Sequence, residues 1–177
     1  MRPVEVAGLS NNHAHDYLEA GFCDTVESLE SHQVGLFHQG QPHVAQVRGT
    51  QVVLIGDCTV VGENTTVTTG VAERVLKGIR AHKRRDNVVV VVMHWGSELD
   101  TFPTKWQRDH GRRFIDAGAD AVVGHHPHVV QGIESYHGRC LAYSLGNFAF
   151  GGNSLARRPE CFVLRLRFRS DRGTIIP

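Results

Sequence analysis

The feature that most constrains this chain is an unbroken apolar run at residues 88–93, five valines and a methionine, which leads directly into His94. β-Branched side chains favour extended backbone, and a run without polar alternation is typical of a strand that is covered on both faces. Such a strand needs other layers of structure on either side of it. The run therefore predicts the central strand of a layered α/β fold, with His94 at the carboxyl end of that strand.

The remaining segments supply the helices and strands that such a fold needs. Helical spacing of apolar residues predicts helices over residues 19–31, over the segment that carries Val71, Val75 and Ile79, and over 104–117. Further strands are predicted at residues 4–9, 44–48, 51–57, 121–123, 133–136, 140–144 and 161–168. Because strands alternate with helices early and strands predominate late, the pattern favours an α/β domain in which helices cover a sheet.

Three local features carry more detailed expectations. Phe22, Val26 and Leu29 lie on one side of the first helix, which is expected to bury that face. Gly49 and Thr50 separate two strand-like segments by the length of a tight hairpin turn. The glycine-rich stretch at residues 151–154 predicts a mobile loop near the site.

Length and composition favour one domain spanning residues 1–177. A domain usually takes roughly 100 to 200 residues, and 41% hydrophobic with 21% charged residues is ordinary for a soluble globular chain. A net charge of +1 means that the chain lacks the excess of basic residues that nucleic-acid-binding proteins carry, so no nucleic-acid partner is expected. The sequence also shows no membrane segment, signal or anchor, and the compartment is therefore left unknown.

Three predicted strands each run into a loop that bears histidine. These loops follow residue 9, residue 93 and residue 123, and the carboxyl ends of strands are where α/β sheets gather their ligand sites. Neutral imidazole is a common ligand of zinc, manganese and iron. The cluster therefore predicts a metal site, while the alternative that these are ordinary loop histidines stays open. The candidate coordinating side chains are Asn12, His94, His126 and His128.

His13 is a candidate general acid beside the candidate ligand Asn12. A histidine in that position can protonate a leaving-group oxygen if a carboxylate orients its ring, and Asp16 is the nearest carboxylate in the sequence. Asp16 can equally cap the helix that follows, and the sequence does not choose between these two roles.

Four motifs together resemble the poly-γ-glutamate capsule-synthesis proteins, which look like a branch of the calcineurin-like metallophosphoesterases. The motifs occur in the family's order and span nearly the whole chain. They are residues 11–17 (NNHAHDY), 94–98 (HWGSE), 118–128 (GADAVVGHHPH) and 143–148 (YSLGNF).

The resemblance implies a four-layer α/β/β/α sandwich of the metallophosphoesterase type, with a metal site at the strand ends. It implies that Asn12, His94 and His126 hold one metal, that His128 binds another, and that His13 is the general acid. Substrate-positioning or supporting roles are expected for Glu98, His125, Glu134 and Asn147.

The sequence also departs from the family pattern. Relatives place two acidic segments ahead of the Asn-His motif, whereas only eleven residues precede Asn12 here, so the sandwich is expected to lack its first strands. Without those carboxylates, neutral ligands offset the repulsion between two cations poorly. We therefore expect one divalent ion, manganese, iron or zinc, rather than two. The strands that remain would leave an open sheet edge, which a homodimer or a partner chain is expected to cover.

These observations lead to a functional hypothesis with one alternative. The chain is expected to be a capsule (poly-γ-glutamate) biosynthesis enzyme with a metal-dependent hydrolase site that acts on a phosphate ester or an anionic polymer. The alternative is a non-catalytic component that binds the polymer or helps to assemble a capsule-synthesis complex. The resemblance suggests the bacterial cell envelope as its location.

Overall fold

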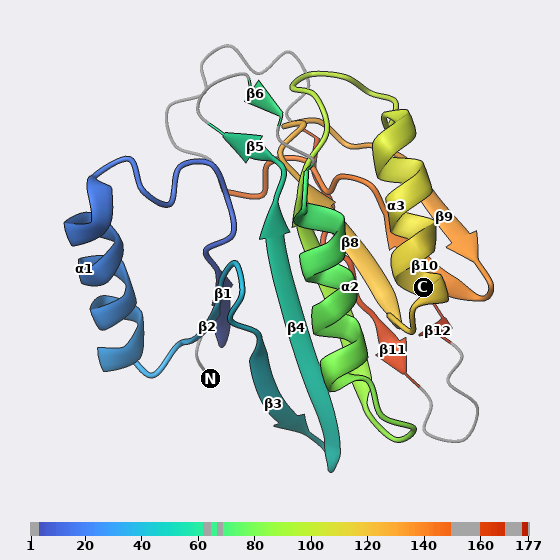
Figure 1. Cartoon of the computed structure of the whole chain (residues 1–177), viewed down its shortest axis with the longest axis horizontal. Helices are drawn as coiled ribbons and strands as arrows, with labels where there is room; N and C mark the ends of the chain where they lie inside the picture. The colour runs from blue at the N-terminus through green and yellow to red at the C-terminus, as the bar shows by residue number, and fades with distance from the viewer. Residues whose placement is uncertain (1–3, 62–64, 67–68, 150–159, 169–174, 177) are drawn as a thin grey trace.

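The computed structural model describes residues 4–61, 65–66, 69–149, 160–168 and 175–176. Its main feature is a six-stranded sheet in the order β3-β4-β7-β8-β10-β9 (Figure 1). The strands are β3 (His43–Val47), β4 (Thr50–Cys58), β7 (Val88–His94), β8 (Ala121–His125), β9 (Ile133–Tyr136) and β10 (Arg139–Ala142). β4, β7, β8 and β10 run parallel, and the two edge strands run antiparallel to their neighbours. The predicted α/β class is confirmed.

The valine run forms the central strand, as predicted. β7 pairs in parallel with β4 on one side and with β8 on the other, and Val89 and Val91 are fully buried. Parallel strands are covered on both faces, which explains why polar residues do not alternate along this one. The sheet is therefore organised around a strand that the sequence identifies by itself.

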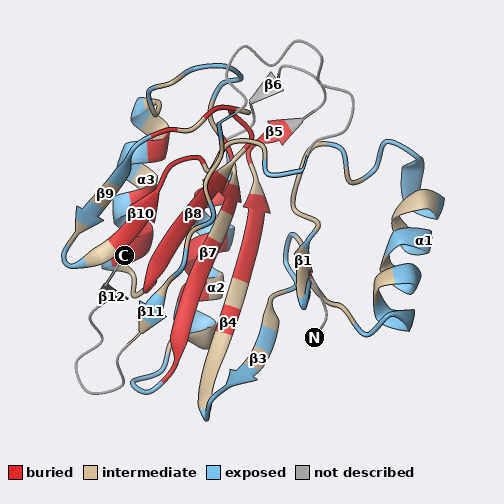
Figure 2. Cartoon of the chain, turned by 180° about the vertical axis from the view of Figure 1, so that it is seen from behind, coloured by how far each residue is buried: buried red, intermediate tan, exposed pale blue. Residues whose placement is uncertain are grey.

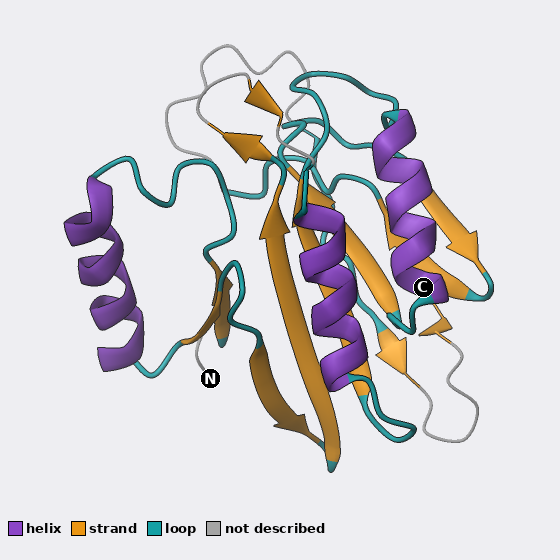
Figure 3. Ribbon diagram, in the orientation of Figure 1, coloured by secondary structure: helices purple, strands orange, loops and turns teal. Residues whose placement is uncertain are grey.

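Two amphipathic helices cover one face of the sheet (Figure 3). α2 (Val71–His82) buries Val75 and Ile79 against the sheet, and α3 (Lys105–Asp116) buries Phe114. Thr104 begins α3 with a capping box, in which its side chain accepts from the backbone N–H of Gln107. Both helices lie where the apolar periodicity predicts them, and they form one helical layer.

The opposite face of the sheet is covered by chain without helices. Val88, Val90 and Ala142 are buried there, and Leu164 and Leu166 pack against them (Figure 2). The strand predicted over residues 161–168 is present only in part, as β11 (Arg167–Phe168) paired with β12 (Ile175–Ile176). Cys161 forms an isolated β-bridge with Gly146, and the backbone N–H of Phe162 donates to the Leu145 carbonyl at 3.1 Å. Leu164 and Leu166 meet the sheet through side-chain packing. The predicted loop at residues 151–154 lies outside the described residues.

A smaller unit stands beside the sheet (Figure 1). β1 (Val6–Gly8) and β2 (Gly35–Phe37) pair in parallel, and α1 (Leu18–Ser31) connects them. The helix forms where predicted, but no residue of it is buried in the described structure, and Phe22, Val26 and Leu29 are only half-buried. The expected buried face is therefore wrong for this chain as it stands, because a two-stranded sheet is too small to cover a helix.

Two short features complete the description. The hairpin turn lies at Arg48 and Gly49, one residue earlier than predicted, because Val47 pairs with Thr50 and both turn residues have positive φ. β5 (Val60–Val61) and β6 (Thr65–Thr66) form a small antiparallel pair above the sheet. Of the four layers that the resemblance implies, the described residues supply one helical layer and one large sheet. Among these residues no helix has the length and apolar character to cross a membrane.

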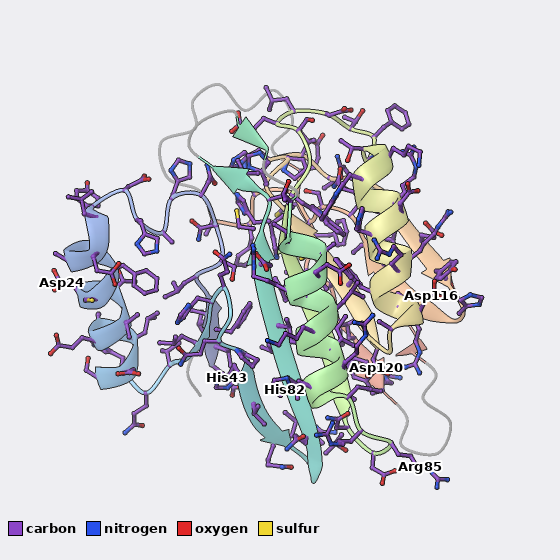
Figure 4. All side chains as sticks on the ribbon, in the orientation of Figure 1. Asp24, His43, His82, Arg85, Asp116 and Asp120 are labelled. Carbon is purple, nitrogen blue, oxygen red and sulfur yellow. The ribbon has the colours of Figure 1, made fainter. Side chains whose placement is uncertain are left out.

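A buried ionic contact fastens the amino ends of the central strands. Asp120 is 3% exposed and accepts from the backbone N–H of Val89 at 2.8 Å and from Lys83 Nζ at 2.6 Å. Arg139 contacts the other carboxylate oxygen. Figure 4 labels Asp120 at the foot of the sheet. A carboxylate that accepts from two cations and an amide can be buried at low cost, and here it joins β7, β8, β10 and the end of α2.

Replacing Val91 by alanine should destabilise the fold because it opens a cavity in the fully buried centre of β7. We expect the free energy of unfolding, measured with urea, to fall by about 1 to 3 kcal/mol. Val44→Ala on the edge strand is the matched control, since Val44 is half exposed; its effect should stay below about 0.5 kcal/mol. Equal losses for the two variants would contradict a core centred on β7.

Asp120→Ala should cost roughly 3 kcal/mol, since it leaves two cations without their buried partner. Lys83 and Arg139 keep about a quarter of their side-chain surface in water, which places the expected loss at the lower end for a broken buried pair. Asp109→Ala, which removes the exposed carboxylate paired with Lys105, should have a much smaller effect in the same denaturation experiment. A loss no larger than that of the control would show that the contact is dispensable.

Candidate metal centre

The candidate ligands meet at the carboxyl ends of the parallel strands. His94 is the last residue of β7 and pairs in register with His125, the last residue of β8. His94 shares its strand face with Val90, so its side chain projects from the side of the sheet without helices. The loop after β1 brings Asn12 to the same place, because Asn12 Oδ1 lies 2.8 Å from His94 Nε2. The predicted convergence of three loops is therefore present in the structure.

Four side chains form a continuous hydrogen-bonded chain across this edge. Asp16 Oδ2 accepts from His13 Nδ1 at 2.9 Å, and the Asn12 amide nitrogen lies 3.2 Å from His13 Nε2. Asn12 Oδ1 then accepts from His94. An amide oxygen can only accept and its nitrogen can only donate, so this order places the His13 proton on Nδ1, toward Asp16. Asp16 thus orients the ring of His13, and no capping bond from its side chain to the helix is seen.

A second group of candidate ligand atoms lies beside this row of hydrogen-bonded side chains. Oxygen or nitrogen atoms of Glu98, His126 and His128 all lie within 4.8 Å of one another. Glu98 was expected to position substrate, and the structure instead places its carboxylate among candidate ligands. The sequence does hold a signal for this placement, because Glu98 follows the strand-end His94 by four residues in the same loop. The ring centroids of His94 and His126 are 4.7 Å apart, which joins the two groups.

The backbone and polar contacts of His126 fit a bound cation. His126 is 7% exposed, and its Nδ1 is buried with no hydrogen-bond partner among the described residues. His126 and His128 both have positive φ, 98° and 58°, a backbone conformation that residues other than glycine adopt at a cost in free energy. An unpartnered nitrogen and a strained backbone at the same residue are expected where a ligand completes the site. The donor set of imidazoles, one amide and one carboxylate suits manganese, iron or zinc.

The electrostatic surroundings keep the buried histidines neutral, as metal binding requires. Burial lowers the pKa of His94 to about 3, and the neighbouring histidines add to that shift. Burial also lowers the pKa of His125 and of His126, although the charge of Glu98 acts in the opposite direction on His126. These shifts favour the neutral imidazole form of His94, His125 and His126, the form that binds a metal.

The remaining predicted site residues fall into two groups. Asn147 Oδ1 accepts from His128 Nδ1 at 2.8 Å, which makes Nε2 the candidate ligand atom of that ring. Glu134 is not brought to the cluster: it lies on the edge strand β9, where it accepts from Arg112 at 2.9 Å and from Tyr143 at 2.6 Å. Glu134 thus links β9 to α3 and β10, and its contacts are those of a structural residue.

Two cavities among the described residues are lined by residues other than the candidate ligands. One of about 340 Å³ lies between β4, α2 and the turn at residues 38–42, on the helical side of the sheet. Another, of about 70 Å³, lies beside Asn11 and Ala14 and is lined in part by Cys58. Within the cluster, His13 keeps 60% of its side chain exposed, whereas His126 is buried.

Comparison with known proteins gives consistent results. A family profile described as "Bacterial capsule synthesis protein PGA_cap" matches residues 3–152. "PGA biosynthesis protein CapA" of Bacillus subtilis is 36% identical over 173 residues, which cover 89% of this chain and 46% of that protein. "Capsule biosynthesis protein CapA" of Bacillus anthracis is 31% identical over 189 residues, which cover 97% of this chain and 46% of that protein. The chain thus spans about half the length of the curated relatives it matches.

One solved structure supports the fold. The crystal structure of a hypothetical protein from Thermus thermophilus superposes with a TM-score of 0.65 at 15% sequence identity, covering 99% of this chain and 74% of that one. At that identity the likeness bears on the fold alone. The profile match and the identity to the Bacillus relatives bear on the family, and together they show that the chain belongs to the bacterial capsule synthesis proteins of the PGA_cap type.

Proposed function

We propose that this chain takes part in poly-γ-glutamate capsule biosynthesis as a metal-dependent hydrolase of the phosphoesterase kind. The observation that carries the hydrolase part is that Glu98, His126 and His128 bring their ligand atoms within 4.8 Å of one another beside the contacting pair Asn12 and His94, where Nδ1 of His126 is buried without a partner among the described residues. The family relationship supports the capsule part, since two relatives are named for capsule or PGA biosynthesis. The side chains proposed to hold the metal are Asn12, His94, Glu98, His126 and His128.

A bound divalent ion would supply Lewis acidity toward a phosphoryl oxygen and lower the pKa of a water molecule. Glu98 contributes the negative charge that the neutral histidines and Asn12 lack. A single carboxylate offsets the charge of one divalent ion better than that of two, which supports a proposal of one ion per chain.

His13 is proposed to move the proton in this reaction. Its ring is held by Asp16 at 2.9 Å and stays largely exposed, so a leaving-group oxygen can approach the other nitrogen, Nε2. In this structure Nε2 accepts from the Asn12 amide nitrogen at 3.2 Å, so the proposal requires that contact to open when Nε2 takes up a proton. The protonated Nε2 then gives its proton to the leaving-group oxygen, and the ring keeps its Nδ1 proton on Asp16. Asn12 contacts both His13 and His94, and it therefore fixes the acid relative to the proposed metal ligands.

The unit formed by β1, β2 and α1 supports a proposal about partners. Its helix buries no residue in the described structure, although its apolar side chains are spaced to do so. We propose that a second copy or another protein chain packs there. A monomer in sedimentation at micromolar concentration would argue against the homodimer.

Metal content per chain tests the site directly. Protein purified without chelator should carry about one equivalent of manganese, iron or zinc by elemental analysis, and His126→Ala should lose most of it. His137→Ala is the matched control, because His137 is exposed on the turn between β9 and β10. If wild-type protein holds no metal, even after metal is added, the proposed metal-dependent hydrolase function is wrong. Retention of the protein by immobilised poly-γ-glutamate would then favour the non-catalytic alternative.

Hydrolysis of an aryl phosphate by the metal-loaded protein tests the proposed acid. His13→Ala should lower kcat by about 10²- to 10⁴-fold without changing the metal content, because it removes a proton donor and no ligand. His15→Ala is the control, since His15 is an exposed histidine in the same loop that pairs with Glu19. Equal activity of the two variants would show that His13 has no catalytic role.

The pH dependence of stability follows from the buried histidines. The pKa of His94 is about 3 when folded and 6.5 when unfolded, so the unfolded chain takes up the proton first as the pH falls. The unfolding free energy of metal-free protein should therefore decrease from about pH 6.5 toward pH 3. His94→Asn cannot titrate and should show a shallower decrease in urea titrations at each pH. Parallel curves for the two proteins would mean that His94 is not buried as described.

A further inference from the structure

Two buried glutamines lie beneath the loop that carries Glu98. Gln107, on α3, is completely buried, and Gln131, between β8 and β9, is 2% exposed. Gln107 Nε2 donates to Gln131 Oε1 at 3.0 Å. A buried primary amide is costly unless its donors and acceptor find partners, so a pair of them in contact indicates a specific structural demand.

Gln131 ties down the middle of the Glu98 loop (residues 95–104). Its amide nitrogen donates to the carbonyl oxygens of Asp100 at 2.8 Å and Phe102 at 3.2 Å. Both amide hydrogens and the amide oxygen of Gln131 are therefore used, and two carbonyls of an otherwise irregular loop gain a partner. The middle of the loop is therefore held in place by the side chain of Gln131.

Gln107 is hydrogen-bonded to one end of the same loop and lies in close contact with the other. Its Oε1 accepts from the backbone N–H of Thr104 at 2.8 Å, where the loop enters α3. At the other end, Gly96 lies directly over the amide, because a Cβ there would come within 2.7 Å of Oε1. Gly96 also has a φ of 91°, which glycine adopts without strain. The loop therefore follows a path that is set by the amide beneath it.

The same glutamine pair joins the Glu98 loop to the histidine loop (residues 126–132). The backbone N–H of Gln131 donates to the carbonyl of Ser144 at 3.1 Å, and Ser144 Oγ donates back to the carbonyl of Val129 at 2.7 Å. The backbone N–H of Leu99 donates to the carbonyl of Pro127 at 2.8 Å. Movement of the Glu98 loop would therefore break a contact at Pro127, between His126 and His128, and contacts at Gln131, which follows them.

We propose that the Gln107–Gln131 pair is a positioning device that sets the Glu98 carboxylate against His126 and His128. This inference rests on the proposed function in that these three residues are taken to hold the metal. The amide nitrogen of Gln131 donates to the carbonyls of Asp100 and Phe102, so the pair acts through the loop backbone. A neutral amide suits this task because it satisfies two carbonyls and another amide without placing a charge beside the cation.

Gln131→Leu removes both donors and the acceptor at similar side-chain size. Asn87→Leu is a closely matched control at the amino end of β7, because Asn87 is also buried and uses the same set of bonds. Its amide nitrogen donates to the His82 carbonyl and to Gln51, and its oxygen accepts from the backbone of Arg84. Both variants lose a buried amide with two donated bonds and one accepted bond, and only one of them lies at the site.

Two measurements distinguish positioning from simple stability. Titration with Mn²⁺ should show an affinity about 10- to 100-fold weaker in Gln131→Leu and unchanged in Asn87→Leu, the range that supporting residues of metal ligands show. Hydrogen exchange of the backbone amides at residues 97–104 should be faster in metal-free Gln131→Leu and unchanged in the control. Gln107→Met leaves the two donors of Gln131 in place and should show smaller changes in the same directions. It replaces Gln131→Leu in both measurements if that variant does not fold.

The outcomes separate this inference from the proposed function. If the variants at Gln131 and Gln107 bind Mn²⁺ as tightly as wild type and their loop exchange is unchanged, the positioning role is wrong. If loop exchange rises while Mn²⁺ affinity falls equally in Asn87→Leu, the glutamines act through stability alone, and the inference is again wrong. If wild-type protein binds no Mn²⁺, the metal function fails, and faster exchange at residues 97–104 would still establish that Gln131 fixes the loop.

Discussion

The parallel pairing of β4, β7 and β8 is the constraint on which the rest of the structure depends. Its register aligns His94 with Cys58 on one side and with His125 on the other, so the loops that carry Glu98 and His126 leave the sheet at one edge. A shift of one residue would turn every side chain of β7 to the opposite face, and His94 would then point toward the helices. The pairing register of β7 with β4 and β8 therefore fixes the direction in which the candidate ligand His94 points.

The site combines side chains that are costly to bury with a backbone that is costly to adopt. Neutral imidazoles tolerate burial better than charged ones, which is why burial lowers the pKa of His94 and of His126. Glu98 brings the one negative charge from an exposed loop, where its hydration is retained. At the opposite end of the sheet, the ion pairs of Asp120 with Lys83 and Arg139 stabilise the strands and so help to offset the cost of the strained backbone at the site.

The fold and part of the site could be predicted because they depend on local patterns. The valine run, the helical spacing in α2 and α3 and the loops that follow strands identify the sheet, its helical layer and the convergence of Asn12, His94, His126 and His128. The burial of α1 was predicted incorrectly, because periodicity shows which face is apolar and not whether anything covers it. The placement of Glu134 at the site was expected from the resemblance alone. The resemblance does not reveal that Glu134 lies on an edge strand, where it pairs with Arg112.

The sequence by itself determined the α/β class, the central strand and the set of histidines at the strand ends, because hydrophobic periodicity and strand order act over short distances along the chain. Only the tertiary structure decided that Glu98 joins His126 and His128, that Asn12 links His13 to His94, and that two buried glutamines lie under the Glu98 loop. These contacts join residues from separate loops, and their geometry depends on how the loops pack. That packing is set by hydrogen bonds between side chains and backbone that no spacing in the sequence specifies.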